Sequence, residues 1–131
     1  MKKMDQENIA HITNIENQAR QFEQNLQLVD NQIHELGEFI KNLNFIIESK
    51  EKDILSSLGR RVYLKAKIED KEKLFVDIGA GVVLKKTPEE TLEIVKEQIT
   101  RLQEVRGQIA FQLELYYKEL DEFIQHQELG Q

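Results

Sequence analysis

Two long runs of apolar residues, spaced by alternating steps of three and four, constrain this chain more than any other feature. The first run makes eleven successive matches, separated by Gln, Asn, Glu, Asp and Lys. This spacing predicts a coiled-coil helix of about 45 residues, roughly 70 Å long. Gly37 lies inside the pattern and costs about 1 kcal/mol relative to alanine, too little to interrupt it. The members are Ile12, Ile15, Ala19, Phe22, Leu26, Val29, Ile33, Leu36, Ile40, Leu43 and Ile47.

A second seam with the same spacing follows, and Arg106 is its one polar member. Either its alkyl stem packs while its charge reaches water, or it makes a polar contact that fixes the helix register. The start of this helix is marked by Thr87 as N-cap, Pro88 at the first helical position and Glu90 as the partner in a capping box. The apolar members are Leu92, Val95, Ile99, Leu102, Ile109, Leu113, Tyr116, Leu120 and Phe123.

The two seams have similar lengths and predict a mainly α fold, a long antiparallel two-helix coiled coil. Each helix has an apolar stripe that must be covered, and the other helix is its nearest cover. Both chain ends should then lie at one tip. We expect a single domain, with a helix over about residues 5–55, two β-hairpins over about 56–86 and a second helix over about 87–129.

The central segment contains the same unit twice, SLGRRVYLKA at 57–66 and DIGAGVVLKK at 77–86. Alternating apolar residues around a short glycine loop predict a β-hairpin, so the turns fall at Gly59, Gly79 and Gly81. A dinucleotide-binding loop would need a third glycine, where this chain has Leu84, and a helix directly after the loop. A strand follows instead, and the Walker pattern is also missing, so we expect no nucleotide cofactor.

Two hairpins supply four short strands, too few to close a barrel or to bury both faces. Their open edges can pair with strands of other chains. We therefore expect an obligate oligomer assembled through a β platform, with the coiled coils projecting from it. The strand residues expected in this assembly are Val62, Leu64, Leu74, Val76, Ile78, Val82 and Leu84.

Composition narrows the functional classes further. The net charge of −6 is unfavourable for nucleic-acid binding, and no apolar run is long enough to span a membrane. The absence of cysteine excludes disulfides and thiolate metal sites, and the start of the chain does not resemble a signal peptide, so we expect a cytoplasmic protein. His11, His34 and His126 show no ligand spacing, and no catalytic motif occurs. We expect no metal, no cofactor and no catalysis.

The central residues resemble the prefoldin α-class subunits of the archaeal type. The run VDIGAGVVLKKTPEET at 76–91 and the preceding VYLKAKIEDKEKLFVDIG carry the resemblance, which extends over essentially the whole chain. Two hairpins rather than one favour the α class over the β class. The first turn departs from the family, in which a proline often precedes the turn and a second glycine lies in it. Arg60 and Arg61 therefore leave the geometry of this turn open.

The resemblance implies an ATP-independent chaperone of the holdase type. Two α and four β subunits would form the β platform, with the coiled-coil tips holding non-native polypeptides and delivering them to a group II chaperonin. Frayed apolar side chains at helix ends can cover exposed apolar surface on a client. Tyr117 and Ile124 lie off the seam and should be more exposed than the seam residues. The candidate client-binding residues are Met1, Met4, Ile9, Ile12, Tyr117, Leu120, Phe123, Ile124 and Leu129.

Two other classes of function remain open at this point. A coiled-coil scaffold or assembly factor of the prefoldin-like type would use the same oligomer to tether specific partners. A nucleotide-binding enzyme would instead require saturable binding of ATP or NAD, which the hairpin interpretation does not predict.

Overall fold

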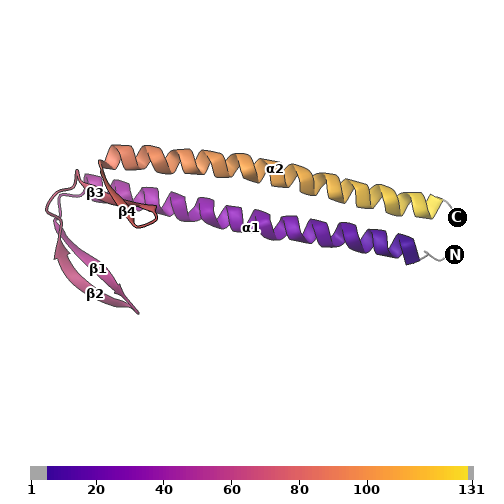
Figure 1. The fold of residues 1–131 in the computed structure, drawn as a ribbon, viewed down its shortest axis with the longest axis horizontal. Helices are drawn as coiled ribbons and strands as arrows, with labels where there is room; N and C mark the ends of the chain where they lie inside the picture. Colours follow the sequence, from indigo (N-terminus) through magenta and orange to yellow (C-terminus); the bar gives the residue numbers. More distant parts are fainter. Residues whose placement is uncertain (1–5, 130–131) are drawn as a thin grey trace. The chain divides into compact units, whose positions relative to one another are not determined.

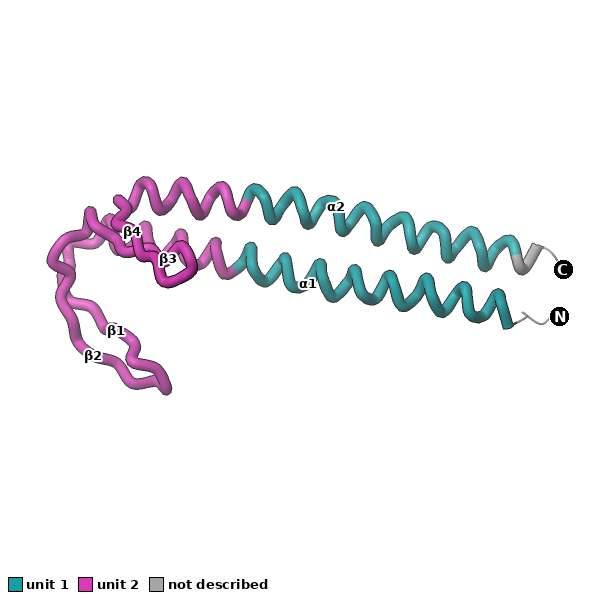
Figure 2. The backbone as a smooth tube through the Cα atoms, viewed as in Figure 1, with its two compact units in different colours: residues 1–34, 100–131 teal, residues 35–99 magenta. Residues whose placement is uncertain are grey.

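The computed structural model describes residues 6–129, with side chains described for residues 6–126. Two long helices flank four strands that form two separate antiparallel hairpins (Figure 1). The chain divides into unit 1, residues 1–34 and 100–131, and unit 2, residues 35–99 (Figure 2). The elements are α1 Gln6–Glu48, β1 Asp53–Gly59, β2 Val62–Lys67, β3 Leu74–Gly79, β4 Val82–Lys86 and α2 Pro88–Leu129.

Unit 1 is a pair of antiparallel helix segments that pack against each other along the predicted seams. Every seam residue in it is buried or half-buried, apart from the one arginine, and Ile15 is only 3% exposed. The Phe22 ring lies 5.4 Å from the Tyr116 ring, and the His11 ring lies 4.9 Å from the Phe123 ring. These pairs bring the beginning of α1 beside the end of α2, so both ends of unit 1 lie at one tip as expected.

The polar seam residue makes a contact between the helices. The Arg106 guanidinium donates a hydrogen bond from Nε to Asp30 Oδ1 at 2.5 Å. Both side chains are nearly half exposed, so the pair is partly solvated. Both alternatives considered for Arg106 therefore hold together, because its charge reaches water and also pairs across the seam.

The helix segments of unit 2 continue the same packing. Leu43 and Val95 are 4% and 6% exposed, and the other seam residues of this unit are half-buried. Neither helix in the described part of the chain has a stretch apolar enough to pass through a bilayer.

The start of α2 follows the predicted cap, with one difference. The Thr87 hydroxyl accepts a hydrogen bond from the Glu90 backbone N–H at 3.1 Å, which confirms Thr87 as N-cap. The Thr91 N–H and hydroxyl both donate to the Thr87 carbonyl oxygen. The Glu90 carboxylate pairs with Lys86 Nζ at 3.7 Å instead of closing the capping box. The oppositely charged Lys86, at the end of β4, attracts the carboxylate.

The end of α1 differs from the expected boundary near residue 55. The helix ends at Glu48, and residues 53–55 belong to β1. The apolar seam stops at Ile47, and the next seam position falls on Lys50. Pairing with β2 satisfies the backbone groups of this segment, and the Ile68 N–H donates to the Lys52 carbonyl oxygen at 2.6 Å.

The two hairpins have the same turn geometry, although their turn residues differ. In each hairpin two residues form the turn, both with positive φ, as in the type I′ turn that matches strand twist. The residue before each turn, Gly59 or Gly79, has φ near 100° and lies in a β-bulge, where glycine alone avoids strain. The φ angles of the turn residues are Arg60 51°, Arg61 65°, Ala80 52° and Gly81 76°.

A leucine in place of Arg106 should stabilise the coiled coil. Arg106→Leu would complete the apolar seam, and we expect the free energy of unfolding to rise by about 1 kcal/mol. Asp30→Asn, which weakens the same ion pair without adding apolar surface, should lower it by less than about 1 kcal/mol. Urea unfolding followed by circular dichroism measures both changes. A destabilised leucine variant would show that the ion pair contributes more than the seam.

The first turn should be strained relative to the second. Arg61→Gly places glycine at positive φ, and we expect the first hairpin to gain about 1 kcal/mol. The matched change Gly81→Arg should destabilise the second hairpin by a similar amount. Hydrogen exchange of the strand amides reports each hairpin separately. Unchanged protection in both variants would mean that arginine bears no cost in this conformation.

Candidate functional site

Each hairpin has an apolar face that contains the predicted assembly residues. Cross-strand pairs place Ser56 opposite Leu64 and Val76 opposite Leu84, so the strand residues of each hairpin share one face. All seven predicted residues lie on these faces. The complete apolar faces are Ile54, Ser56, Leu58, Val62, Leu64 and Ala66 in the first hairpin, and Leu74, Val76, Ile78, Val82 and Leu84 in the second.

These apolar faces are largely uncovered in the single chain. Val62, Leu64 and Ile78 are more than half exposed, whereas Leu74 and Val76 are half-buried. An isolated two-stranded sheet is marginally stable in water, and contiguous exposed apolar surface of this kind is typical of protein interfaces. The geometry therefore fits contact with further strands.

The opposite side of each hairpin, the second face, was not identified from the sequence. It includes Leu55 and Tyr63 in the first hairpin and Phe75 and Val83 in the second, all more than half exposed. The Lys85 ammonium lies 5.7 Å from the centroid of the Phe75 ring. Side chains along a strand alternate between its two faces, so the alternation that identified the apolar faces also places these residues on the opposite face. The second face could therefore have been predicted from the sequence.

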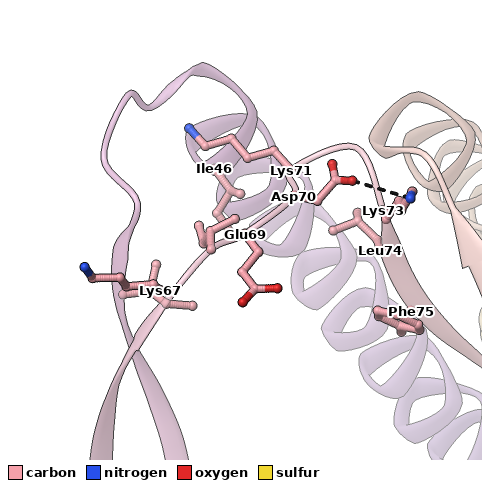
Figure 3. Close-up of a pocket in the computed structure, with 10 residues that line it drawn as sticks. Ile46, Lys67, Glu69, Asp70, Lys71, Lys73, Leu74 and Phe75 are labelled. Carbon is pink, nitrogen blue, oxygen red and sulfur yellow. Dashed lines mark ion pairs between the residues drawn. The ribbon is translucent and has the colours of Figure 1, made fainter.

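Unit 2 also has an open pocket of about 620 Å³ where the two hairpins and α1 meet (Figure 3). Ile46 of α1, Ile54 of β1 and Leu74 of β3 line it, so it continues the apolar faces of both hairpins. Charged side chains of residues 67–73 surround it, and Lys73 Nζ pairs with Asp70 Oδ2 at 3.8 Å. The pocket can accept an apolar side chain of another strand, with charged groups at its rim.

The predicted tip residues in unit 1 divide into two groups by exposure. Ile12, Leu120 and Phe123 are half-buried in the seam, as their spacing predicts. Ile9, Tyr117 and Ile124 are 52%, 44% and 37% exposed. Met1, Met4 and the side chain of Leu129 lie outside the described residues.

The three exposed tip residues lie on one edge of the helix pair. With Ile12 and Leu120 at position a, all three fall at position e of the heptad. In antiparallel helices the e positions flank the same side of the seam. His11 and Glu119 fall at position g, and their side chains lie 3.9 Å apart on the other side. The tip therefore has two different edges. The apolar edge consists of Ile9, Tyr117 and Ile124, and the polar edge contains His11 and Glu119.

Within residues 6–126, no group of three or more His, Asp or Glu lies close enough together to hold a metal ion. The expectation of no cofactor remains a prediction.

Comparison with known proteins identifies the family. A family model for the prefoldin subunit matches residues 15–128. The chain belongs to the prefoldin family. Prefoldin is a family of chaperone subunits rather than of enzymes, and its members assemble with other prefoldin subunits.

Several curated relatives are α subunits of archaeal prefoldin, and another is a UXT homolog of Dictyostelium discoideum, 34% identical over 50% of this chain and 42% of the relative. The chain is 28% identical to prefoldin subunit alpha of Methanoregula boonei over 86% of this chain and 74% of the relative. It is 29% identical to prefoldin subunit alpha of Methanopyrus kandleri over 62% of this chain and about half, 52%, of the relative. These matches agree with the α-class resemblance.

The fold is also similar to a solved structure. The cryo-EM structure of filamentous PFD from Methanocaldococcus jannaschii superposes with a TM-score of 0.76 at 18% identity, covering 86% of this chain and 94% of that chain. The likeness confirms two long helices joined by two antiparallel hairpins.

Proposed function

We propose that this prefoldin subunit is an ATP-independent holdase that captures non-native polypeptides with its coiled-coil tip. The observation that carries the proposal is the apolar edge of the tip, which remains exposed although the seam beside it is packed. Apolar residues exposed singly are common on protein surfaces, whereas several gathered on one edge are typical of a binding surface. In a family of chaperone subunits, unfolded chains are the natural ligand for this edge.

Capture by this edge requires no nucleotide. An unfolded client exposes apolar side chains, and their contact with Ile9, Tyr117 and Ile124 removes apolar surface from water on both sides. A single tip offers little area, so binding by each tip alone should be weak. Several tips on one assembly would bind one client together, which raises the effective concentration and the overall affinity.

The assembly that we propose is a hexamer of two copies of this subunit and four prefoldin β subunits, joined through the hairpins. The exposed apolar faces and the pocket between them support this arrangement, because each needs a further strand to cover it. We also propose a cytoplasmic location and delivery of clients to a group II chaperonin, both from the family. No nucleic acid and no membrane is part of this proposal.

Polar substitution of the apolar edge should weaken client capture without affecting assembly. We expect Ile9→Ser/Tyr117→Ser/Ile124→Ser to lose most of its ability to suppress the aggregation of a chemically denatured protein, measured by light scattering of the assembled complex. Leu28→Ser/Phe111→Ser is a matched control, because it removes similarly exposed apolar residues elsewhere in unit 1 and should keep activity.

The same aggregation assay also distinguishes a holdase from a scaffold that tethers specific partners. Full suppression by the substituted complex would show that the apolar edge is not the client site. A wild-type complex that suppresses no aggregation at stoichiometric amounts would favour a scaffold that tethers specific partners.

A charge on the apolar face of the second hairpin should prevent assembly. In Val76→Asp, the carboxylate would be buried between strands, which costs several kcal/mol, and we expect loss of the hexamer with β subunits in light scattering after size exclusion. Val83→Asp is the matched control on the second face of the same hairpin and should retain the hexamer. An intact hexamer with Val76→Asp would contradict the assignment of this face to assembly.

A further inference from the structure

The two hairpins share an apolar face but differ in charge. Residues 53–67 carry four basic side chains against one carboxylate, whereas residues 74–86 carry two against one. The excess lies on the turn and the second face of the first hairpin, where Arg60 and Arg61 take the places of Ala80 and Gly81. Because the repeat keeps the apolar face and the turn geometry, assembly alone does not explain these cations. We call this surface the cationic face: Leu55, Arg60, Arg61, Tyr63, Lys65 and Lys67.

The cationic face combines charge with apolar surface, and its one carboxylate, Asp53 opposite Lys67, leaves an excess of positive charge. Leu55 and Tyr63 are 69% and 59% exposed. Within residues 6–126 the four basic side chains form no ion pair. Two of them, Arg60 and Arg61, are also held at positive φ, a costly conformation for arginine. A partner of matching chemistry would present carboxylates together with apolar groups.

A surface of this chemistry lies on α1 in the same unit. Steps of three and four along α1 bring carboxylates and aromatic rings onto one outer stripe of the helix. Phe45 is 72% exposed, and the Glu38 carboxylate pairs with Lys41 Nζ at 3.3 Å on the helix surface. We call this surface the acidic stripe: Glu35, Glu38, Phe39, Asn42 and Phe45.

We propose that the cationic face docks on the acidic stripe of a second copy of this chain. Glu35 and Glu38 of the stripe and the cations of the face are exposed within one chain. Only Phe45, at the end of the stripe, lies near the chain's own first hairpin, where it lines a small pocket with Asp53 and Ile54. A twofold arrangement satisfies both surfaces at once, because each copy supplies a face and a stripe to the other. The apolar groups supply contact area, and the charges select orientation and partner. Apart from Lys67, which also lines the pocket assigned to the platform, the contact uses residues outside the apolar faces, and it does not depend on client capture.

A charge swap between two copies tests this contact. Arg60→Glu/Arg61→Glu makes the face repel the stripe, and Glu35→Lys/Glu38→Lys makes the stripe repel the face. We expect each variant alone to weaken self-association of the isolated full chain by about tenfold or more at low salt. An equimolar mixture of the two variants should associate again as a heterodimer, since every contact then joins opposite charges. Sedimentation velocity measures the association, and circular dichroism verifies folding.

Glu16→Lys/Glu23→Lys is the control for net charge, because it alters two exposed carboxylates elsewhere on α1 by the same amount. It should neither weaken self-association nor rescue the arginine variant. The proposal is overturned if the mixture stays monomeric, if this control acts like the stripe variant, or if the wild-type chain does not self-associate at low salt. If self-association returned only when the arginine and glutamate substitutions were combined in one chain, the contact would instead be intramolecular.

Discussion

The packing of one apolar seam against another is the interaction on which the rest of the structure depends. Each helix has a single stripe to bury, and the core is correspondingly narrow, with Ile15, Val29, Leu43 and Val95 among its few buried side chains. Two helices can cover only the stripes that face each other, so apolar residues elsewhere stay in water. The sites that we propose for this subunit consist of such uncovered residues, at the tip of unit 1 and on the hairpins of unit 2.

The hairpins leave apolar surface exposed that strands of another chain could cover. Each has only two strands, and apart from partly covered residues such as Leu74 and Val76, the strand side chains are mostly exposed in the single chain. Backbone pairing and turn geometry fix the shape of each hairpin, but burial of its apolar face has to come from another chain. In the assembly that we propose, partner strands would cover this apolar surface, and the stability of the subunit would then depend on its partners.

Comparison of the two repeated hairpins shows which residues the shared backbone geometry requires and which residues differ between the hairpins. Gly59 and Gly79 occupy equivalent bulges with nearly equal φ, because only glycine adopts that conformation without strain. The turn positions that follow tolerate Ala and Gly in one hairpin and two arginines in the other. Since the backbone conformation is the same, the two turns differ in the side chains that they expose, which are positively charged in the first hairpin and uncharged in the second.

The sequence by itself determined the two helices, their antiparallel pairing, the hairpins and the family, because these depend on local periodicity and turn residues. It also placed Tyr117 and Ile124 off the seam. It did not determine that α1 ends at Glu48, because the helix boundary depends on the pairing of residues 53–55 with β2, although the apolar seam already stops at Ile47. Only the tertiary structure decided that Arg106 pairs with Asp30 and that the Phe22 ring lies beside the Tyr116 ring. Those outcomes depend on how two helices align with each other, which the pattern of either helix alone does not contain.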